Sequence, residues 1–266
     1  MSRETLPFPH SSIPPLKPYL PPSSLSSSPS SSHSKPHLTL TYATSLDAAL
    51  SLAPGVRTTL SGPYSKSMTH YLRTRHDAIL VGCTTAIVDN PALNSRLDTI
   101  TSLDQQPRPI ILDPKGRWEF TEDSQVIRLA AEFKGKGPWV ITTRGKEGKE
   151  RGELLGRVGG KYLFLEVGEN GRFKWGDVLG LLEEEGVKSV MVEGGGEVIN
   201  SLLVEPENKL VDSVIVTIAP AWLGQGGVVV SPVRTEGQEQ LRLKDVSWQP
   251  HGEDVVLCGR IFTQLS

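Results

Sequence analysis

Residues 187–203, with the sequence VKSVMVEGGGEVINSLL, decide the fold of this chain. The first half is a β-branched run that predicts a buried strand, and the second half has apolar residues at helical spacing. Gly194, Gly195 and Gly196 therefore lie at a strand-to-helix junction. Because glycine has no Cβ, backbone N–H groups can approach an anion there, and the helix dipole favours negative charge. A tight turn without a ligand would use the same residues, so the motif alone leaves both readings open.

The composition sets limits on the class of protein. With 37% hydrophobic and 22% charged residues in 266, the chain can bury a full core, and its net charge of −2 gives no reason to expect a nucleic-acid partner. Cys83 and Cys258 are far apart and neither belongs to a Cys-x-x-Cys pair, so no disulfide framework and no metal site are expected. A reduced compartment, cytoplasmic or nuclear, is favoured over an oxidising one, and the cytoplasm is the expected location. No apolar run reaches the roughly 18 residues that a membrane span needs.

Residues 1–36 differ from the rest of the chain. They contain 12 Ser and 9 Pro, which together fill 21 of the 36 positions. This composition predicts a disordered tail, followed by one folded domain over residues 37–266. Removing the tail is therefore expected to leave activity nearly untouched.

Apolar runs separated by polar or glycine-rich links predict an alternation of strands and helices. Besides the central stretch, strands are predicted over residues 37–42, 77–82, 109–112, 139–142, 162–167, 213–219, 241–248 and 254–262, and helices over residues 64–75, 83–91 and 175–185. Residues 145–160, rich in glycine and in charges of both signs, are expected to be the least ordered part of the domain. The order of elements predicts a three-layer α/β domain with a mixed sheet that ends in antiparallel strands.

Two polar segments are candidates for ligand contacts. Residues 89–96 form a loop with an Asp, two amides and an Arg, and the predicted helix over residues 64–75 carries Arg73 near its end. Loops dense in hydrogen-bonding side chains are often functional, although a solvated loop has the same composition. An Arg at a helix C-terminus is also favoured by the dipole, so a structural role for Arg73 remains open as well.

Five blocks of residues resemble the riboflavin-pathway reductase family. They are TYATSLD (41–47), MTHYLR (68–73), ILVG (79–82), DNPALNSR (89–96) and VMVEGGG (190–196). The resemblance extends from about residue 38 to about residue 262 and leaves out the Ser/Pro-rich tail. It implies a dihydrofolate-reductase-like fold with a mixed, mostly parallel central sheet and an antiparallel C-terminal edge. It also implies a homodimer that uses NADPH to reduce the ribosylamino group of a phosphorylated aminopyrimidine to a ribitylamino group, by hydride transfer to the sugar C1′.

The resemblance also implies roles for individual residues. Positions that match cofactor contacts of the family are Ala43, Thr85, Asp89, Gly194, Gly195, Gly196, Glu197 and Val198. Positions that match substrate contacts are Arg73, Leu93, Asn94, Arg96 and Glu193. The two arginines suit a substrate phosphate, since a guanidinium group can present two parallel donors to an oxyanion. Glu193 is expected to orient the substrate more than to transfer a proton.

The chain departs from the family pattern in places. Many relatives have Leu-Asp-Gly-Lys after the first strand, whereas this chain has Leu46-Asp47-Ala48-Ala49. Residues 251–253 match the His-x-Glu of fused zinc deaminases, but the paired cysteines are missing, so a C-terminal turn is predicted instead. Two alternatives remain open: a dihydrofolate-type reductase of another substrate, and a catalytically silent nucleotide-binding module.

Overall fold

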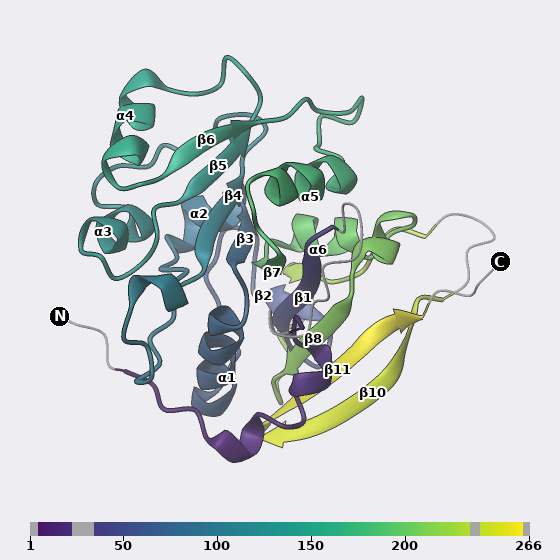
Figure 1. The fold of residues 1–266 in the computed structure, drawn as a ribbon. Helices are drawn as coiled ribbons and strands as arrows, with labels where there is room; N and C mark the ends of the chain where they lie inside the picture. The colour runs from purple at the N-terminus through teal and green to yellow at the C-terminus, as the bar shows by residue number, and fades with distance from the viewer. Residues whose placement is uncertain (1–4, 23–34, 235–239, 263–266) are drawn as a thin grey trace, which may run out of the picture.

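A nine-stranded mixed sheet runs through the computed structural model, which describes residues 5–22, 35–234 and 240–262 (Figure 1). The order of its strands is β10-β11-β8-β1-β7-β3-β4-β5-β6. The bounds are β1 (His37–Thr44), β3 (Ala78–Gly82), β4 (Arg108–Leu112), β5 (Trp139–Thr142), β6 (Lys161–Phe164), β7 (Ser189–Gly194), β8 (Ser213–Ile218), β10 (Arg242–His251) and β11 (Asp254–Phe262). Strands β1 and β3 to β8 are parallel where they pair, and the β10–β11 hairpin joins β8 antiparallel. This arrangement confirms the predicted fold class.

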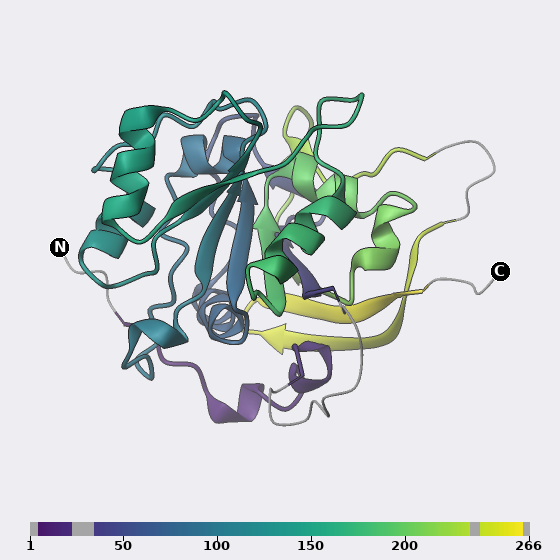
Figure 2. The same cartoon turned by 45° about the horizontal axis from the view of Figure 1, so that its top comes forward.

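Helices cover both faces of the sheet, because alternate strand residues point to opposite faces (Figure 2). On one face, Leu80 and Val192 pack in a core with α5 (Trp175–Glu184) and α6 (Gly196–Leu202). On the other, Ile79 and Val81 pack with α2 (Cys83–Asp89), α3 (Gln125–Ala131) and α4 (Lys149–Arg157). The third core cluster lies under α1 (Pro63–Thr74), which Figure 2 shows nearly end-on. In the described part of the chain, no helix is both long enough and apolar enough to cross a membrane.

Some elements were not predicted from the sequence. The helices α3 and α4 are additional, as is a small sheet of β2 (Ala49–Ser51) and β9 (Val228–Val229). Helix α4 occupies the segment that was expected to be least ordered. It forms because Leu154 and Leu155, which are 8% and 0% exposed, are buried in the core, and tertiary packing outweighs the poor helix propensity of the surrounding glycines.

The prediction of a disordered tail is wrong for residues 5–22. This segment contains the short 3₁₀ helices η1 (His10–Ser12) and η2 (Lys17–Tyr19), and Leu16, Tyr19 and Leu20 are buried in the core cluster under α1. Prolines restrict the unfolded chain, so fewer apolar contacts are needed to order the segment. The serine-rich residues 23–34 lie outside the described residues.

The loop after β1 contains the position at which this chain has Ala48 instead of a glycine. Asp47 accepts hydrogen bonds from the Ser45 hydroxyl and from the backbone N–H groups of Leu223 and Gly224, which together lower its pKa to about 2. The carboxylate therefore ties the loop to residues 223–224. The turn places Ala48 at a φ of 60°, in the left-handed region that a side chain disfavours.

We expect Ala48→Gly to raise the free energy of unfolding by about 0.5–1 kcal/mol, because glycine adopts this conformation without steric cost. Urea unfolding measures the change. Ala53→Gly, in the loop after β2 and not at a positive φ, serves as the control and should lower stability by a similar amount. A loss of stability in Ala48→Gly would contradict the prediction.

Candidate functional site

The glycine turn between β7 and α6 lies at the carboxyl edge of the parallel strands, where open α/β sheets bind their ligands. Gly195 has a φ of 85°, which requires glycine. A Cβ built at Gly195 would lie 3.1 Å from Thr85 Oγ1, and one at Gly82 would lie 2.9 Å from Val198 Cγ2. The β3–α2 and β7–α6 junctions are therefore packed directly against each other.

Two of the residues predicted to hold the cofactor belong to elements next to this turn. Thr85 contacts it, and Ala43 lies near the end of β1, which is the parallel neighbour of β7. A Cβ built at Gly194 would meet no atom within 4 Å, so a gap lies against the backbone there, as a phosphate cradle needs. Since α6 has only seven residues, open backbone rather than a helix dipole favours an anion at this position.

Two of the predicted cofactor residues have neighbours that limit their roles. Glu197 is exposed and forms an ion pair with Arg172 at 2.7 Å, so it is the backbone of Glu197, not its carboxylate, that suits a phosphate. Asp89 is the last residue of α2, and burial raises its pKa while the nearby Arg57 opposes that shift.

Arg73 and Glu193 form a largely buried ion pair. The Arg73 Nε donates to Glu193 Oε1 at 2.7 Å and its NH2 donates to Oε2 at 2.6 Å, while NH1 donates to the carbonyl oxygen of Asn94 at 2.8 Å. Both side chains are 13% exposed. The sequence suggested that Arg73 and Arg96 together would hold a phosphate. In the structure Arg73 lines the same pocket as Arg96, and it also holds Glu193 and the carbonyl oxygen of Asn94 by hydrogen bonds.

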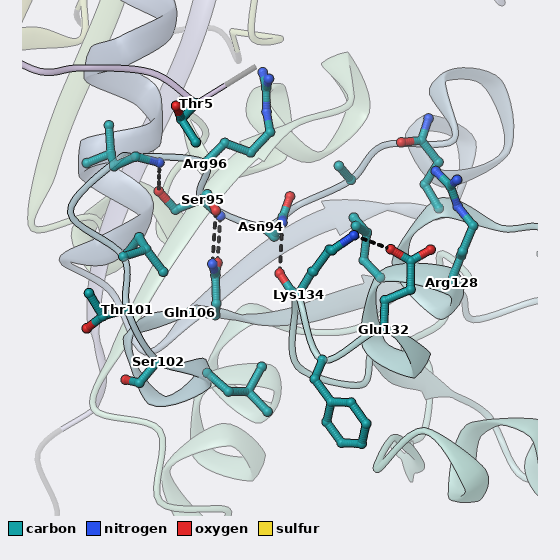
Figure 3. A pocket seen from close by; sticks show the side chains of 17 residues that line it. Thr5, Asn94, Ser95, Arg96, Thr101, Ser102, Gln106, Arg128, Glu132 and Lys134 are labelled. Carbon is teal, nitrogen blue, oxygen red and sulfur yellow. Dashed lines mark hydrogen bonds and ion pairs between the residues drawn. The ribbon is translucent and has the colours of Figure 1, made fainter. Parts of the chain in front are cut away.

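The polar loop over residues 89–96 has a fixed shape. Leu93 has a φ of 52° and its side chain is buried in the core, so only its backbone can face a ligand. The Asn94 side chain is also buried and donates to the carbonyl oxygen of Lys134 at 2.8 Å. Gln106 both accepts from the Ser95 N–H and donates to the Ser95 carbonyl (Figure 3).

A basic pocket of about 560 Å³ opens between α1 and this loop. Its lining includes four cationic side chains and no carboxylate: Arg57, Lys66, Arg73 and Arg96. Helix α1 contributes Lys66, Thr69, His70 and Arg73, which are spaced three and four residues apart and therefore share one helical face. Sequence reasoning missed Arg57, Lys66 and His70, although the helical spacing from Lys66 to Arg73 was a signal for two of them.

His70 holds Arg96 in this pocket without adding a charge. Its Nδ1 accepts the backbone N–H of Arg96 at 3.1 Å, and its Nε2 lies 3.3 Å from the Arg96 guanidinium group. Burial, reinforced by the positive charges of Arg73 and Arg96, lowers the pKa of His70 to about 2, so the imidazole is neutral at physiological pH.

A second cavity, of about 400 Å³, is also lined by Arg96 (Figure 3). Ala92, Arg96 and Gln125 line both spaces. Within the described residues, no group of His, Cys, Asp or Glu side chains could hold a metal ion. The site therefore consists of a glycine turn, a buried ion pair and a basic pocket.

Comparisons with known proteins agree with this picture. Residues 36–257 match the family model described as the RibD C-terminal domain. The chain is 43% identical to the 2,5-diamino-6-ribosylamino-4(3H)-pyrimidinone 5′-phosphate reductase of Eremothecium gossypii, covering 92% of this chain and 94% of that one. The enzyme of the same name from Saccharomyces cerevisiae is 42% identical, over 85% of this chain and 87% of that one.

Solved structures of related proteins have the same fold. The riboflavin biosynthesis reductase Rib7 of Saccharomyces cerevisiae matches with a TM-score of 0.71 and 38% identity, covering 88% of this chain and 93% of that one. RibD of Acinetobacter baumannii shares the fold, with a TM-score of 0.68 at 22% identity. The fold and these relatives thus define a reductase with a dihydrofolate-reductase-like domain. The chain belongs to the RibD C-terminal domain family and, with its fungal relatives, to the reductases of riboflavin biosynthesis.

Proposed function

We propose that this protein catalyses the NADPH-dependent reduction of 2,5-diamino-6-ribosylamino-4(3H)-pyrimidinone 5′-phosphate to the corresponding ribitylamino compound. The fungal relatives are named for this substrate. The observation that supports the proposal is the basic pocket of Arg57, Lys66 and Arg96, which suits the 5′-phosphate and lies along the loop that leads from α2. Guanidinium and ammonium groups are the usual partners of a phosphate.

The glycine turn fits a dinucleotide cofactor. The open backbone at Gly194 would face the phosphates of the cofactor, and Gly195 supplies the positive φ that the turn needs. Ala43, Thr85 and Asp89 would lie around the phosphates. Bound NADPH supplies a hydride for the reduction. The chain's own part is to hold the two reactants in line and to keep the site rigid, which is catalysis by proximity and electrostatics.

The Arg73–Glu193 pair links the two halves of the proposed site. Glu193 immediately precedes the glycine turn on β7, and Arg73 comes from the helix that lines the basic pocket. Each carboxylate oxygen has a further lone pair beyond the one that Arg73 occupies, so Glu193 can accept from an amino or hydroxyl group of the substrate. We assign it the role of orienting the substrate.

Absorbance of NADPH during turnover tests the proposal directly. The purified protein is mixed with NADPH and the ribosylaminopyrimidine phosphate, with the unphosphorylated compound, dihydrofolate and NADH as controls. We expect rapid oxidation of NADPH only with the phosphorylated substrate. Turnover with dihydrofolate would favour a dihydrofolate-type reductase. Binding of NADPH without any turnover would favour a catalytically silent nucleotide-binding module.

We further propose a homodimer that works in the cytoplasm, where the buried free thiols of Cys83 and Cys258 stay reduced. Strand β10 is one of the two edge strands of the described sheet, and its Val246 and Trp248 are 42% and 60% exposed. Such an edge is open to pairing, so a second copy of the chain suits this surface.

Trp248→Glu is expected to shift the protein from dimer to monomer, because burying an unpaired charge in an apolar interface is costly. Light scattering coupled to size exclusion measures the mass. Trp222→Glu, at an exposed tryptophan outside β10, is the control and should leave the mass unchanged. A wild-type protein that elutes as a monomer would rule out the dimer.

A further inference from the structure

The N-terminal segment, residues 5–22, reaches the backbone of Arg96, whose side chain lines the basic pocket. We call it the N-terminal strap. Leu6 forms a parallel bridge with Leu97, and Thr5 lines the second cavity beside Arg96 (Figure 3). The strap then passes α1 and ends in the core cluster under that helix. It therefore contacts both elements that build the pocket, the loop and the helix.

At the loop, the strap holds the backbone of Arg96. The Leu6 N–H donates to the Arg96 carbonyl oxygen at 2.9 Å, and the Asp98 N–H donates to the Leu6 carbonyl oxygen at 3.2 Å. On the other side, the Arg96 N–H donates to His70 Nδ1. Both backbone polar groups of Arg96 are thus fixed, one by α1 and one by the strap.

At the helix, the strap packs against α1. The ring of Phe8 stacks on Tyr71 with 4.9 Å between the centroids, and Leu16 and Leu20 are buried in the cluster that includes Met68 and Leu72. These residues alternate along α1 with the pocket-lining Lys66, His70 and Arg73. The helix is therefore clamped between the strap and the pocket.

We propose that the strap is a positioning element for the anionic end of the substrate, an inference that rests on the proposed function. By fixing the Arg96 backbone, it aims the guanidinium group into the pocket before the substrate arrives, so less conformational entropy is lost on binding. Leu6 acts through Arg96 and does not itself touch the substrate.

Leu6→Pro tests this directly, because proline has no N–H to donate to Arg96. We expect the dissociation constant and KM of the phosphorylated substrate to rise roughly fivefold, the usual worth of one hydrogen bond, with kcat and the dissociation constant of NADPH unchanged. Leu6→Ala keeps the N–H and should bind the phosphorylated substrate as tightly as the wild type does. Ser12→Pro removes a different strap hydrogen bond, to Pro9, and should leave KM at the wild-type value.

The outcomes separate the two proposals. If Arg96→Ala raises KM and Leu6→Pro does not, the strap inference alone is overturned. If Arg96→Ala also leaves KM unchanged, the proposed substrate site falls and the strap inference falls with it. Should Leu6→Pro fail to fold, Phe8→Ala gives a second reading, with an expected two- to threefold rise in KM from loss of the Tyr71 contact. Equal changes in KM, kcat and NADPH binding would show a merely structural role.

Discussion

Arg96→Ala is expected to lower kcat/KM for the phosphorylated substrate by about 30- to 150-fold, the equivalent of about 2–3 kcal/mol. Arg96 lies between two cavities with its backbone fixed, so no other cation of the pocket can replace it at the same position. The loss should appear mainly in KM, and the dissociation constant of NADPH should change little, because the glycine turn is built from other residues.

Steady-state kinetics with both ligands varied measure this change. Arg75→Ala is the matched control, since Arg75 is exposed at the end of α1 and does not line the pocket. Arg96→Lys should recover part of the activity, because the charge remains but the two parallel donors are lost. An equal rise in KM for NADPH and for substrate would show that Arg96 does not serve the phosphate.

Glu193→Ala is expected to lower the free energy of unfolding by about 3 kcal/mol. Removing one partner of a buried ion pair leaves the other charge uncompensated, and Arg73 would keep only its bond to Asn94 among the three. The same change should also abolish most of the activity, because Glu193 adjoins the glycine turn. Urea unfolding followed by fluorescence measures the stability.

Glu122→Ala provides the control for this prediction. Its partner Arg157 is 2.9 Å away, but both side chains are more than half exposed, so little change in stability is expected. A double variant, Arg73→Met with Glu193→Leu, should be more stable than Glu193→Ala alone while remaining inactive. A Glu193→Ala protein as stable as the wild type would show that the pair is not a structural brace.

Strands were more predictable than helices. The strand over residues 139–142 and that over residues 254–262 agree with β5 and β11 at both ends, because β-branched runs bounded by polar links are a local signal. Helix α4 was missed because its glycines and charges look disordered, and only the core contacts of Leu154 and Leu155 reveal it. Helix α4 depends on tertiary contacts, and a local sequence pattern does not contain that information.

The sequence identified separate segments of the candidate site, but it did not identify the ion pair between Arg73 and Glu193. The sequence located the glycine turn and the 89–96 loop, since both are dense in residues with special backbone or hydrogen-bonding roles. Whether an arginine faces a ligand or a carboxylate depends on distances across the fold, and Arg73 and Glu193 are 120 positions apart. The same holds for Arg57, which reaches the pocket from a loop with no motif.

The N-terminal segment shows how averaging a composition hides a boundary. Taken together, residues 1–36 look uniform, but within the described strap residues 5–22 contain seven Pro and two Ser, together with the apolar side chains that become buried. The nine serines of residues 23–34 dominated the prediction. The earlier expectation that residues 1–36 are dispensable for activity is accordingly replaced by the strap proposal.

The β3–α2 and β7–α6 junctions pack closely, so the residue tolerated at one junction depends on the residue present at the other. Gly82 has no room for a methyl group while Val198 keeps its full size, and Thr85 in turn limits what Gly195 can become. A larger residue at position 82 is therefore tolerable only together with a smaller one at position 198. A library that varies position 82 alone would record it as immutable, whereas one that varies positions 82 and 198 together would find compensated combinations; Gly195 stays a glycine in both because of its positive φ.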